Sequence, residues 1–73
     1  MIQIPISILE LAVVNQNSNA KTAIENSMKV AQLGDSLNYK RIWFAEHHNT
    51  AHIASSATAL LIQLAAGQTE KIR

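Results

Sequence analysis

Hydrophobic and polar residues follow one another along this chain in blocks that predict strands and helices in turn. Residues 4–11 are rich in isoleucine and leucine and predict a first strand, in which Pro5 is tolerated near the start. The nearly continuous apolar character of this segment indicates burial on both faces, as in a parallel sheet. The polar residues 15–19 then predict a loop whose side chains can cap a helix.

A first helix is expected over residues 20–37, because apolar and small residues recur there at steps of three and four. The stripe consists of Ala20, Ala23, Ile24, Ser27, Met28, Ala31, Gly34 and Leu37. Thr22 also satisfies the spacing of a capping box and is an alternative start. Ala31 and Gly34 are small enough to let the helix approach a sheet closely, and Asn38 suits the left-handed conformation that ends many helices.

The second half of the chain repeats the alternation of strand and helix. A second strand is predicted over residues 42–45, with a loop over residues 46–54 behind it. After a second helix, residues 70–73 look like the entry into a third strand. The order is β-α-β-α-(β), which favours a parallel sheet with right-handed crossovers. The predicted fold class is α/β, and residues 1–73 are expected to form one unit.

The second helix is expected to begin at Ser55 or Ser56 and to run through Ala66, with Gly67 as its stop. A helix that covers one side of a sheet needs a single apolar stripe, whereas this one is apolar nearly all round and must be covered on a second side. Three interpretations remain open: a place inside a larger domain, a subunit interface, or the surface of a membrane. The lack of basic residues argues against the last.

Composition limits what so short a chain can do. Its 73 residues include 48% hydrophobic residues, no cysteine and a net charge of +1, which predicts one small domain without disulfides. A charge this close to zero gives no electrostatic footprint for nucleic acid or an anionic membrane. Residues 1–5 lack a basic targeting start, and residues 56–67 are far fewer than the roughly 20 that a membrane span needs. A cytoplasmic protein is the expectation.

Candidate chemistry gathers directly after the second strand, where Glu46, His47 and His48 follow one another. Ligands and reactions collect beyond the carboxyl ends of strands in parallel α/β folds, and histidine titrates nearest neutral pH. Neighbouring side chains on an extended segment point to opposite faces, so His47 and His48 are not both expected inside one site. A metal site with His52 is the rival, but the spacing matches no zinc signature, and no metal is predicted.

Five short motifs follow one another along the chain. They are SILE at 7–10, LNYKRIW at 37–43, AEHHN at 45–49, IASSA at 53–57 and TEKIR at 69–73. In this order and spacing they resemble the N-terminal end of the luciferase-like, flavin-dependent monooxygenases, the bacterial luciferase superfamily. The resemblance covers essentially the whole chain. Its one local departure is Asn38, where the family usually has glycine, and asparagine also tolerates the left-handed conformation.

The resemblance implies the N-terminal portion of a TIM-type barrel of eight β/α units, incomplete in this chain. It implies reduced flavin mononucleotide (FMN), supplied by a partner flavin reductase, and transfer of one oxygen atom of O2 to an organic substrate. His47 matches the active-site histidine near the reactive edge of the flavin, with Glu46 and His48 as its motif neighbours. Asn49 extends the motif and is assigned, with His47, to cofactor binding. Helices from this part of the barrel build the subunit interface in luciferases, which implies a homo-oligomer through residues 56–67.

The length of the chain sets a second expectation. A barrel's phosphate site usually involves the loops after strands seven and eight, and these residues cannot supply them. The isolated chain is therefore expected to be inactive. The alternative function is a non-catalytic association module or gene remnant that pairs through the apolar helix 56–67. The choice between FMN and a deazaflavin stays open, as does a stand-alone domain with an unrelated ligand.

Overall fold

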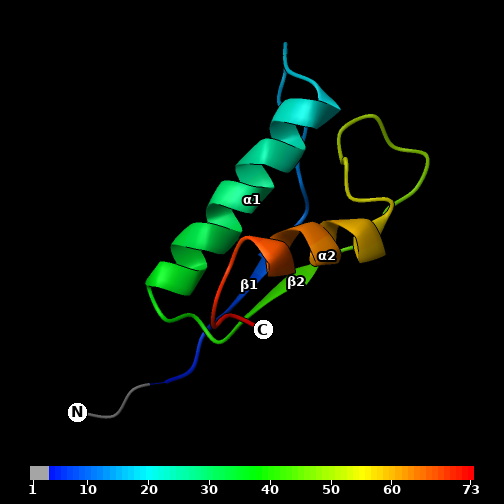
Figure 1. The fold of residues 1–73 in the computed structure, drawn as a ribbon. Coiled ribbons are helices and arrows are strands. Elements are labelled where there is room, and N and C mark those ends of the chain that lie inside the picture. The colour runs from blue at the N-terminus through cyan, green and yellow to red at the C-terminus, as the bar shows by residue number, and fades with distance from the viewer. Residues whose placement is uncertain (1–3) are drawn as a thin grey trace.

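The chain's computed structural model describes residues 4–73, in which helices and strands alternate (Figure 1). The elements are β1 Ser7–Glu10, α1 Ala20–Ser36, β2 Arg41–Phe44 and α2 Thr58–Gly67. The predicted order is confirmed, although each strand has only four residues and is shorter than, or shifted from, its predicted range. The first three residues, which belong to the segment predicted to lack a targeting signal, lie outside the described residues. None of the helices in the described part of the chain is long and apolar enough to cross a membrane.

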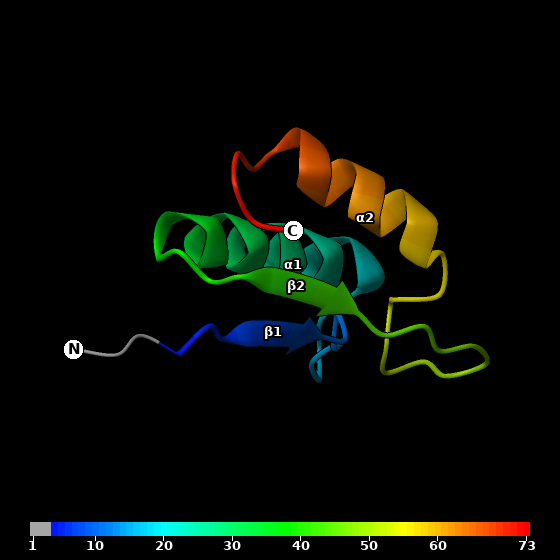
Figure 2. The same ribbon diagram turned by 90° about the horizontal axis from the view of Figure 1, so that it is seen from below.

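The two strands form a parallel sheet that is covered on one face. The register pairs Ser7 with Arg41 and Glu10 with Phe44, so both strands end at the same edge. Figure 2 shows α1 and α2 together on one side of the sheet. On the other side, Leu9 is 64% exposed and Trp43 60%. The prediction that the first strand is buried on both faces is therefore wrong for this chain, because no described segment covers the second face.

The first helix begins where the polar loop predicted it. The Asn19 side chain accepts a hydrogen bond from the backbone N–H of Thr22 at 2.9 Å, which fixes Ala20 as the first helical residue and excludes the alternative start at Thr22. At the other end, Asn38 has a left-handed φ of 63° and the N–H of Tyr39 donates to the carbonyl of Gly34 at 2.9 Å. This is the Schellman arrangement, and it confirms the conformation predicted for Asn38.

The core is small and lies between α1, α2 and β2. Met28, Ala31 and Ala65 are buried together, with Ile42 and Phe44 packed against them. Small residues on α1 make this packing possible, as the sequence predicted. Gly34, one turn further along α1, is a second small residue that permits close packing.

Gly34 shows how closely α1 approaches the sheet. A Cβ atom added to this glycine would lie 2.8 Å from Cδ1 of Ile8 on β1 and 3.2 Å from Cδ1 of Ile72 near the C-terminus. Ordinary carbon–carbon contacts are about 3.5–4.0 Å. The prediction that Gly34 permits a close helix–sheet contact is confirmed.

The second helix starts later than predicted and has no side-chain cap. Ala57 occupies the N-cap position, and no side-chain hydrogen bond caps the helix there. The prediction that Ser55 or Ser56 caps it is wrong. The carbonyl of Ser55 accepts from the N–H of His47 at 2.8 Å and the N–H of Ser56 donates to Ala54 at 3.1 Å, so both residues belong to the preceding loop. Gly67 is the last helical residue, close to the predicted stop.

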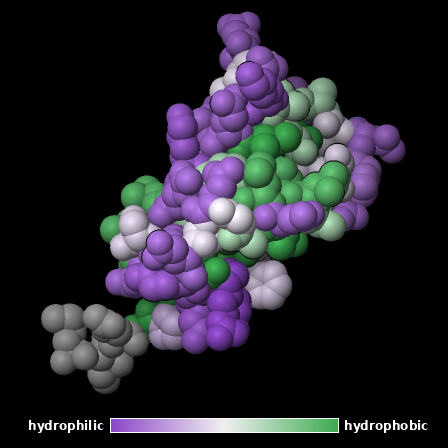
Figure 3. All heavy atoms as spheres, viewed as in Figure 1, coloured by the Kyte–Doolittle hydropathy of each residue, from purple (hydrophilic) through white to green (hydrophobic). Residues whose placement is uncertain are grey.

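One side of α2 faces the core and the rest is open. Leu61 and Ala65 are buried. By contrast, Leu60 is 67% exposed, Ile62 52% and Leu64 42%. Figure 3 shows the apolar surface that gathers over the middle of the molecule, where α2 lies. The second covering layer that the sequence predicted for this helix is absent from residues 4–73.

The last residues of the chain begin to extend the sheet. The N–H of Arg73 donates to the carbonyl of Lys40 at 3.1 Å, and the carbonyl of Arg73 accepts from the N–H of Ile42 at 2.7 Å. One residue bonded to both neighbours of Arg41 in this way has the pattern of a parallel ladder. The chain thus reaches the free edge of β2 at the place predicted for a third strand, although Arg73 is not part of an assigned strand.

Candidate functional site

The predicted site residues lie where the two strands end. β1 ends at Glu10 and β2 at Phe44, and the N–H of Ala45 donates to the carbonyl of Glu10 at 3.1 Å, one step beyond the assigned ladder. Residues 46–49 follow directly, at the carboxyl edge of the sheet. In parallel β/α folds this edge carries the chemistry.

Backbone contacts hold the loop that contains these residues. Two hydrogen bonds join it to the segment after β1, from the N–H of Val14 to the carbonyl of His52 at 2.7 Å and from the N–H of Ala54 to the carbonyl of Ala12 at 2.9 Å. They flank an isolated antiparallel bridge. The loop after β2 is therefore held against the segment after β1.

Glu46 joins the loop to the second helix. Its Oε1 accepts a hydrogen bond from the Thr58 hydroxyl at 2.6 Å, and its Oε2 lies 3.0 Å from Nε2 of His48. The Thr58 hydroxyl, and after it His48, hold the pKa of the Glu46 carboxyl below its usual value. Glu46 is consequently ionised near neutral pH and acts as a hydrogen-bond acceptor. This state suits a residue that positions His48 and Thr58 better than one that donates a proton.

The two adjacent histidines have different surroundings. His48 is bonded to Glu46, and Glu46 is bonded to Thr58 at the first turn of α2. His47 lies between the members of this pair, and its backbone N–H donates to Ser55 at 2.8 Å. Because side chains alternate along an extended segment, we expect the His47 ring on the side opposite the pair, the side on which Trp43 of β2 is exposed.

Asn49 and His52 complete the loop. Asn49 has a left-handed φ of 58°, a conformation that asparagine adopts more readily than most residues. The backbone N–H of His52 donates to Oγ1 of Thr50 at 3.3 Å. Within residues 4–73, no group of three or more histidine, aspartate or glutamate side chains is arranged to hold a metal ion.

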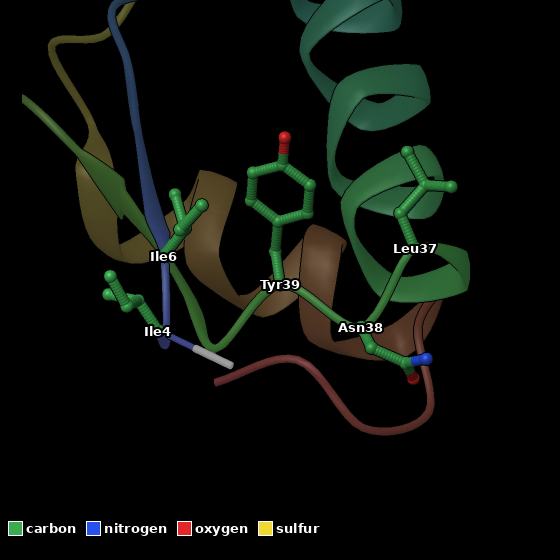
Figure 4. Close-up of a pocket in the computed structure, with 5 residues that line it drawn as sticks. All are labelled: Ile4, Ile6, Leu37, Asn38 and Tyr39. Atoms are coloured by element: carbon green, nitrogen blue, oxygen red, sulfur yellow. The ribbon is translucent and has the colours of Figure 1, made fainter. Parts of the chain in front are cut away.

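One hollow of the surface lies away from these residues. Ile4, Ile6, Leu37, Asn38 and Tyr39 line a space of about 330 Å³ at the amino ends of the strands (Figure 4). In β/α barrels this end serves stability, whereas reactions occur at the carboxyl ends. The hollow is therefore no part of the candidate site.

Two site-shaping residues escaped the sequence analysis. Thr58 stands out only as one of two polar side chains in α2, with Gln63 as the other. Glu10 is the single charge in the first strand, and its Oε2 accepts hydrogen bonds from the Ser27 hydroxyl at 2.7 Å and from the N–H of Ala12 at 2.9 Å. These bonds fix the left-handed turn at Ala12, whose φ is 52°. A polar residue in a mostly apolar element is the signal that both share.

Two of the known proteins to which this chain is similar are named monooxygenases. No family model matches the sequence. The chain is 42% identical over 66 residues to a luciferase-like monooxygenase of Escherichia coli (strain K12), a match that covers 90% of this chain and 20% of that protein. It is 37% identical over 70 residues to N-acetyl-S-alkylcysteine monooxygenase of Bacillus subtilis (strain 168), covering 96% and 21% respectively. The chain thus spans about a fifth of the length of these relatives.

Solved structures confirm the fold. The crystal structure of apo-MsnO8 matches 97% of this chain and 21% of its own length, with a TM-score of 0.94 and 34% identity. The oxygenating constituent of 3,6-diketocamphane monooxygenase from Pseudomonas putida, a type II Baeyer–Villiger monooxygenase in complex with FMN, matches 99% and 20% with a TM-score of 0.87. Its 21% identity shows the fold alone. The predicted fold class is confirmed: the chain is an incomplete TIM-type barrel.

Proposed function

Because this chain is a homologue of the luciferase-like monooxygenases that spans about a fifth of their length, we propose that it contributes two β/α units to a flavin-dependent monooxygenase. The complete enzyme transfers one oxygen atom of O2 to an organic substrate with reduced FMN. The observation that carries the proposal is the place of the His47 backbone, directly beyond the carboxyl edge of the sheet and beside the hydrogen-bonded Glu46–His48 pair.

The residues of the open face fit a planar aromatic cofactor. Leu9 and Trp43 present exposed apolar surface on this face, and His47 stands beyond its carboxyl edge. Reduced FMN, when bound, supplies the electrons and the reactive centre for O2. The phosphate site of a barrel usually involves the loops after strands seven and eight, so the phosphate of the cofactor would be bound by segments other than residues 4–73.

In this proposal the residues of the AEHHN motif have different roles. His47 holds or moves a proton beside the flavin, because an imidazole can do both near neutral pH. Glu46 and His48 keep the segment in place from the other side. Asn49 turns the chain and contributes to the cofactor's surroundings. Glu46 and His48 are thus supporting residues of the catalytic motif.

Partners follow from the same proposal. A flavin reductase would deliver reduced FMN. A second copy of the chain, or of the complete barrel, would cover the exposed side chains of α2, of which Leu60 is 67% exposed. The same exposure favours the second candidate function, a non-catalytic association module that pairs through this helix. The two candidates differ in whether His47 matters.

The proposal is tested in a chimeric barrel. The chain replaces the matching 70 residues of the Bacillus subtilis N-acetyl-S-alkylcysteine monooxygenase, and turnover of an N-acetyl-S-alkylcysteine is measured with reduced FMN in air. We expect the chimera to be active and His47→Asn to lower kcat by about 100-fold or more, the usual contribution of a general acid or base. His52→Asn, which changes an exposed histidine of the same loop, is the matched control and should retain activity.

Two results would contradict the proposal. One is a chimera that folds and binds FMN but does not turn over, since the chain would then fail to supply its part of the site. The other is an active chimera in which His47→Asn and His52→Asn behave alike. For the isolated 73-residue chain we expect no activity and no micromolar binding of FMN, measured by equilibrium dialysis.

A further inference from the structure

The contact between Glu46 and Thr58 connects two parts of the chain that no regular element joins. Thr58 is the first residue of α2, and Glu46 follows β2 by two positions. The hydroxyl–carboxylate hydrogen bond between them is 2.6 Å long, in the range of a strong charge-assisted bond. A second bond from the same carboxylate, at 3.0 Å, reaches His48.

We propose that Thr58 is a positioning residue of the site: its hydroxyl fixes Glu46 against α2, and Glu46 fixes His48, so that His47 is presented on the opposite side. This inference rests on the proposed function for its catalytic consequence. The hydrogen-bonded arrangement itself can be tested without it.

The start of α2 makes this contact more important than one surface hydrogen bond would be. Ala57 provides no side-chain cap, and the first turn contains no acidic residue of its own. The ionised Glu46 brings a negative charge to this turn from outside the helix, where the helix dipole favours it. Substituting Thr58 would therefore loosen the loop and the first turn together.

The backbone contacts of the loop leave the Glu46–Asn49 segment in need of a side-chain anchor. The backbone hydrogen bonds from Ala54 to Ala12 and from Val14 to His52 hold the second half of the loop, around residues 52–54. Near the motif, the backbone bond from His47 to Ser55 holds the chain at one point. The orientation of the peptide about that point is set by the Glu46 side chain, which is bonded on both oxygens.

Three variants of the chimeric barrel test the catalytic consequence. Thr58→Val has nearly the same shape but lacks the hydroxyl, and we expect kcat to fall by about tenfold, because small displacements of a reacting group are costly. We expect KM for the organic substrate to stay nearly unchanged. Thr58→Ser keeps the hydroxyl and should restore kcat. Thr69→Val removes a hydroxyl that bonds Ala65 at the other end of α2, and should behave as the unsubstituted chimera.

The hydrogen bond is tested separately in the 73-residue chain. The side-chain carboxyl carbon of Glu46 is followed by NMR during a pH titration of the parent, Thr58→Val and Thr58→Ser chains. Loss of the hydroxyl should raise the pKa of Glu46 in Thr58→Val, because that hydroxyl is the largest cause of its depression, and Thr58→Ser should keep the parent value.

Each outcome bears on the inference in a defined way. Identical Glu46 titrations in all three chains would overturn the hydrogen bond, whatever the chimera does. An altered titration with unchanged kcat in Thr58→Val would overturn the positioning role while leaving His47 and the proposed function intact. Failure of the proposed function would appear instead as an insensitivity of the chimera to His47→Asn.

Discussion

Alanine substitution at two glycines, one in a close contact and one in open space, tests how tightly α1 is packed against the sheet. Gly34 lies within α1 and Gly67 ends α2, and neither has a positive φ. A Cβ at Gly34 would meet Cδ1 of Ile8 at 2.8 Å and Cδ1 of Ile72 at 3.2 Å, whereas one at Gly67 would meet nothing within 4 Å. Alanine substitution adds the same methyl group at both places.

The expected free energies differ because only one site is crowded. Glycine to alanine inside a helix stabilises by about 1 kcal/mol through backbone propensity, and somewhat less at a helix end. At Gly34 the new methyl lies roughly 0.7 Å closer to Ile8 than an ordinary contact allows, and overpacking costs about 1–3 kcal/mol. The balance is a loss of roughly 0–2 kcal/mol for Gly34→Ala and a gain of about 0.5 kcal/mol for Gly67→Ala.

Thermal unfolding followed by far-UV circular dichroism compares the two variants with the parent chain. A change of 1 kcal/mol moves the midpoint of a domain of this size by about 4–8 °C. We expect the midpoint to rise for Gly67→Ala and to stay level or fall for Gly34→Ala. A Gly34→Ala chain stabilised as much as Gly67→Ala would refute the close approach of α1 to β1.

Three further changes test other parts of the structure. Ser27→Ala should destabilise the chain by about 1.5–3 kcal/mol in urea unfolding, since its buried hydroxyl bonds a carboxylate. Ser55→Ala should be neutral or stabilising, because the buried Ser55 hydroxyl is unpaired within the described residues; equal losses in both would contradict the hydrogen-bond assignment. The pKa of Asp35 is lowered by backbone hydrogen bonds from Glu70, Lys71 and Ile72, so its stabilisation is present above about pH 4 and is lost as the pH falls through the folded value. In Asp35→Asn the loss of midpoint temperature between pH 7 and pH 3 should shrink, and an unchanged loss would show that this carboxylate does not hold the C-terminal segment.

Local patterns predicted the elements well. Asn19 and the stripe of small and apolar residues define α1 within one residue, because capping and periodicity act over a single turn. The left-handed Asn38 and the close approach at Gly34 depend on backbone geometry that residue type signals directly. The position of the candidate site followed from strand order, since parallel strands share their carboxyl edge.

Contacts between distant segments were harder to predict. Ser56 has the chemistry of a helix cap, but Ser55 next to it is bonded to His47 and draws this stretch into the loop, so α2 starts at Thr58. The pairing of Thr58 with Glu46 joins residues 12 positions apart through a loop that has no period. The wrong prediction about the burial of the first strand has a different cause. The apolar residues of this strand predict that both faces of the sheet are covered, but residues 4–73 cover only one of them.

In the proposed enzyme, His47 faces the flavin while Glu46 holds His48 on the other side. The most direct measurement is modification of the chimeric barrel by diethyl pyrocarbonate, with and without saturating FMN, followed by mass spectrometry of the peptide that contains residues 46–52. We predict that FMN slows modification of His47 and leaves His52 unchanged. Protection of His48 in place of His47, or of neither, would contradict this arrangement of the two histidines.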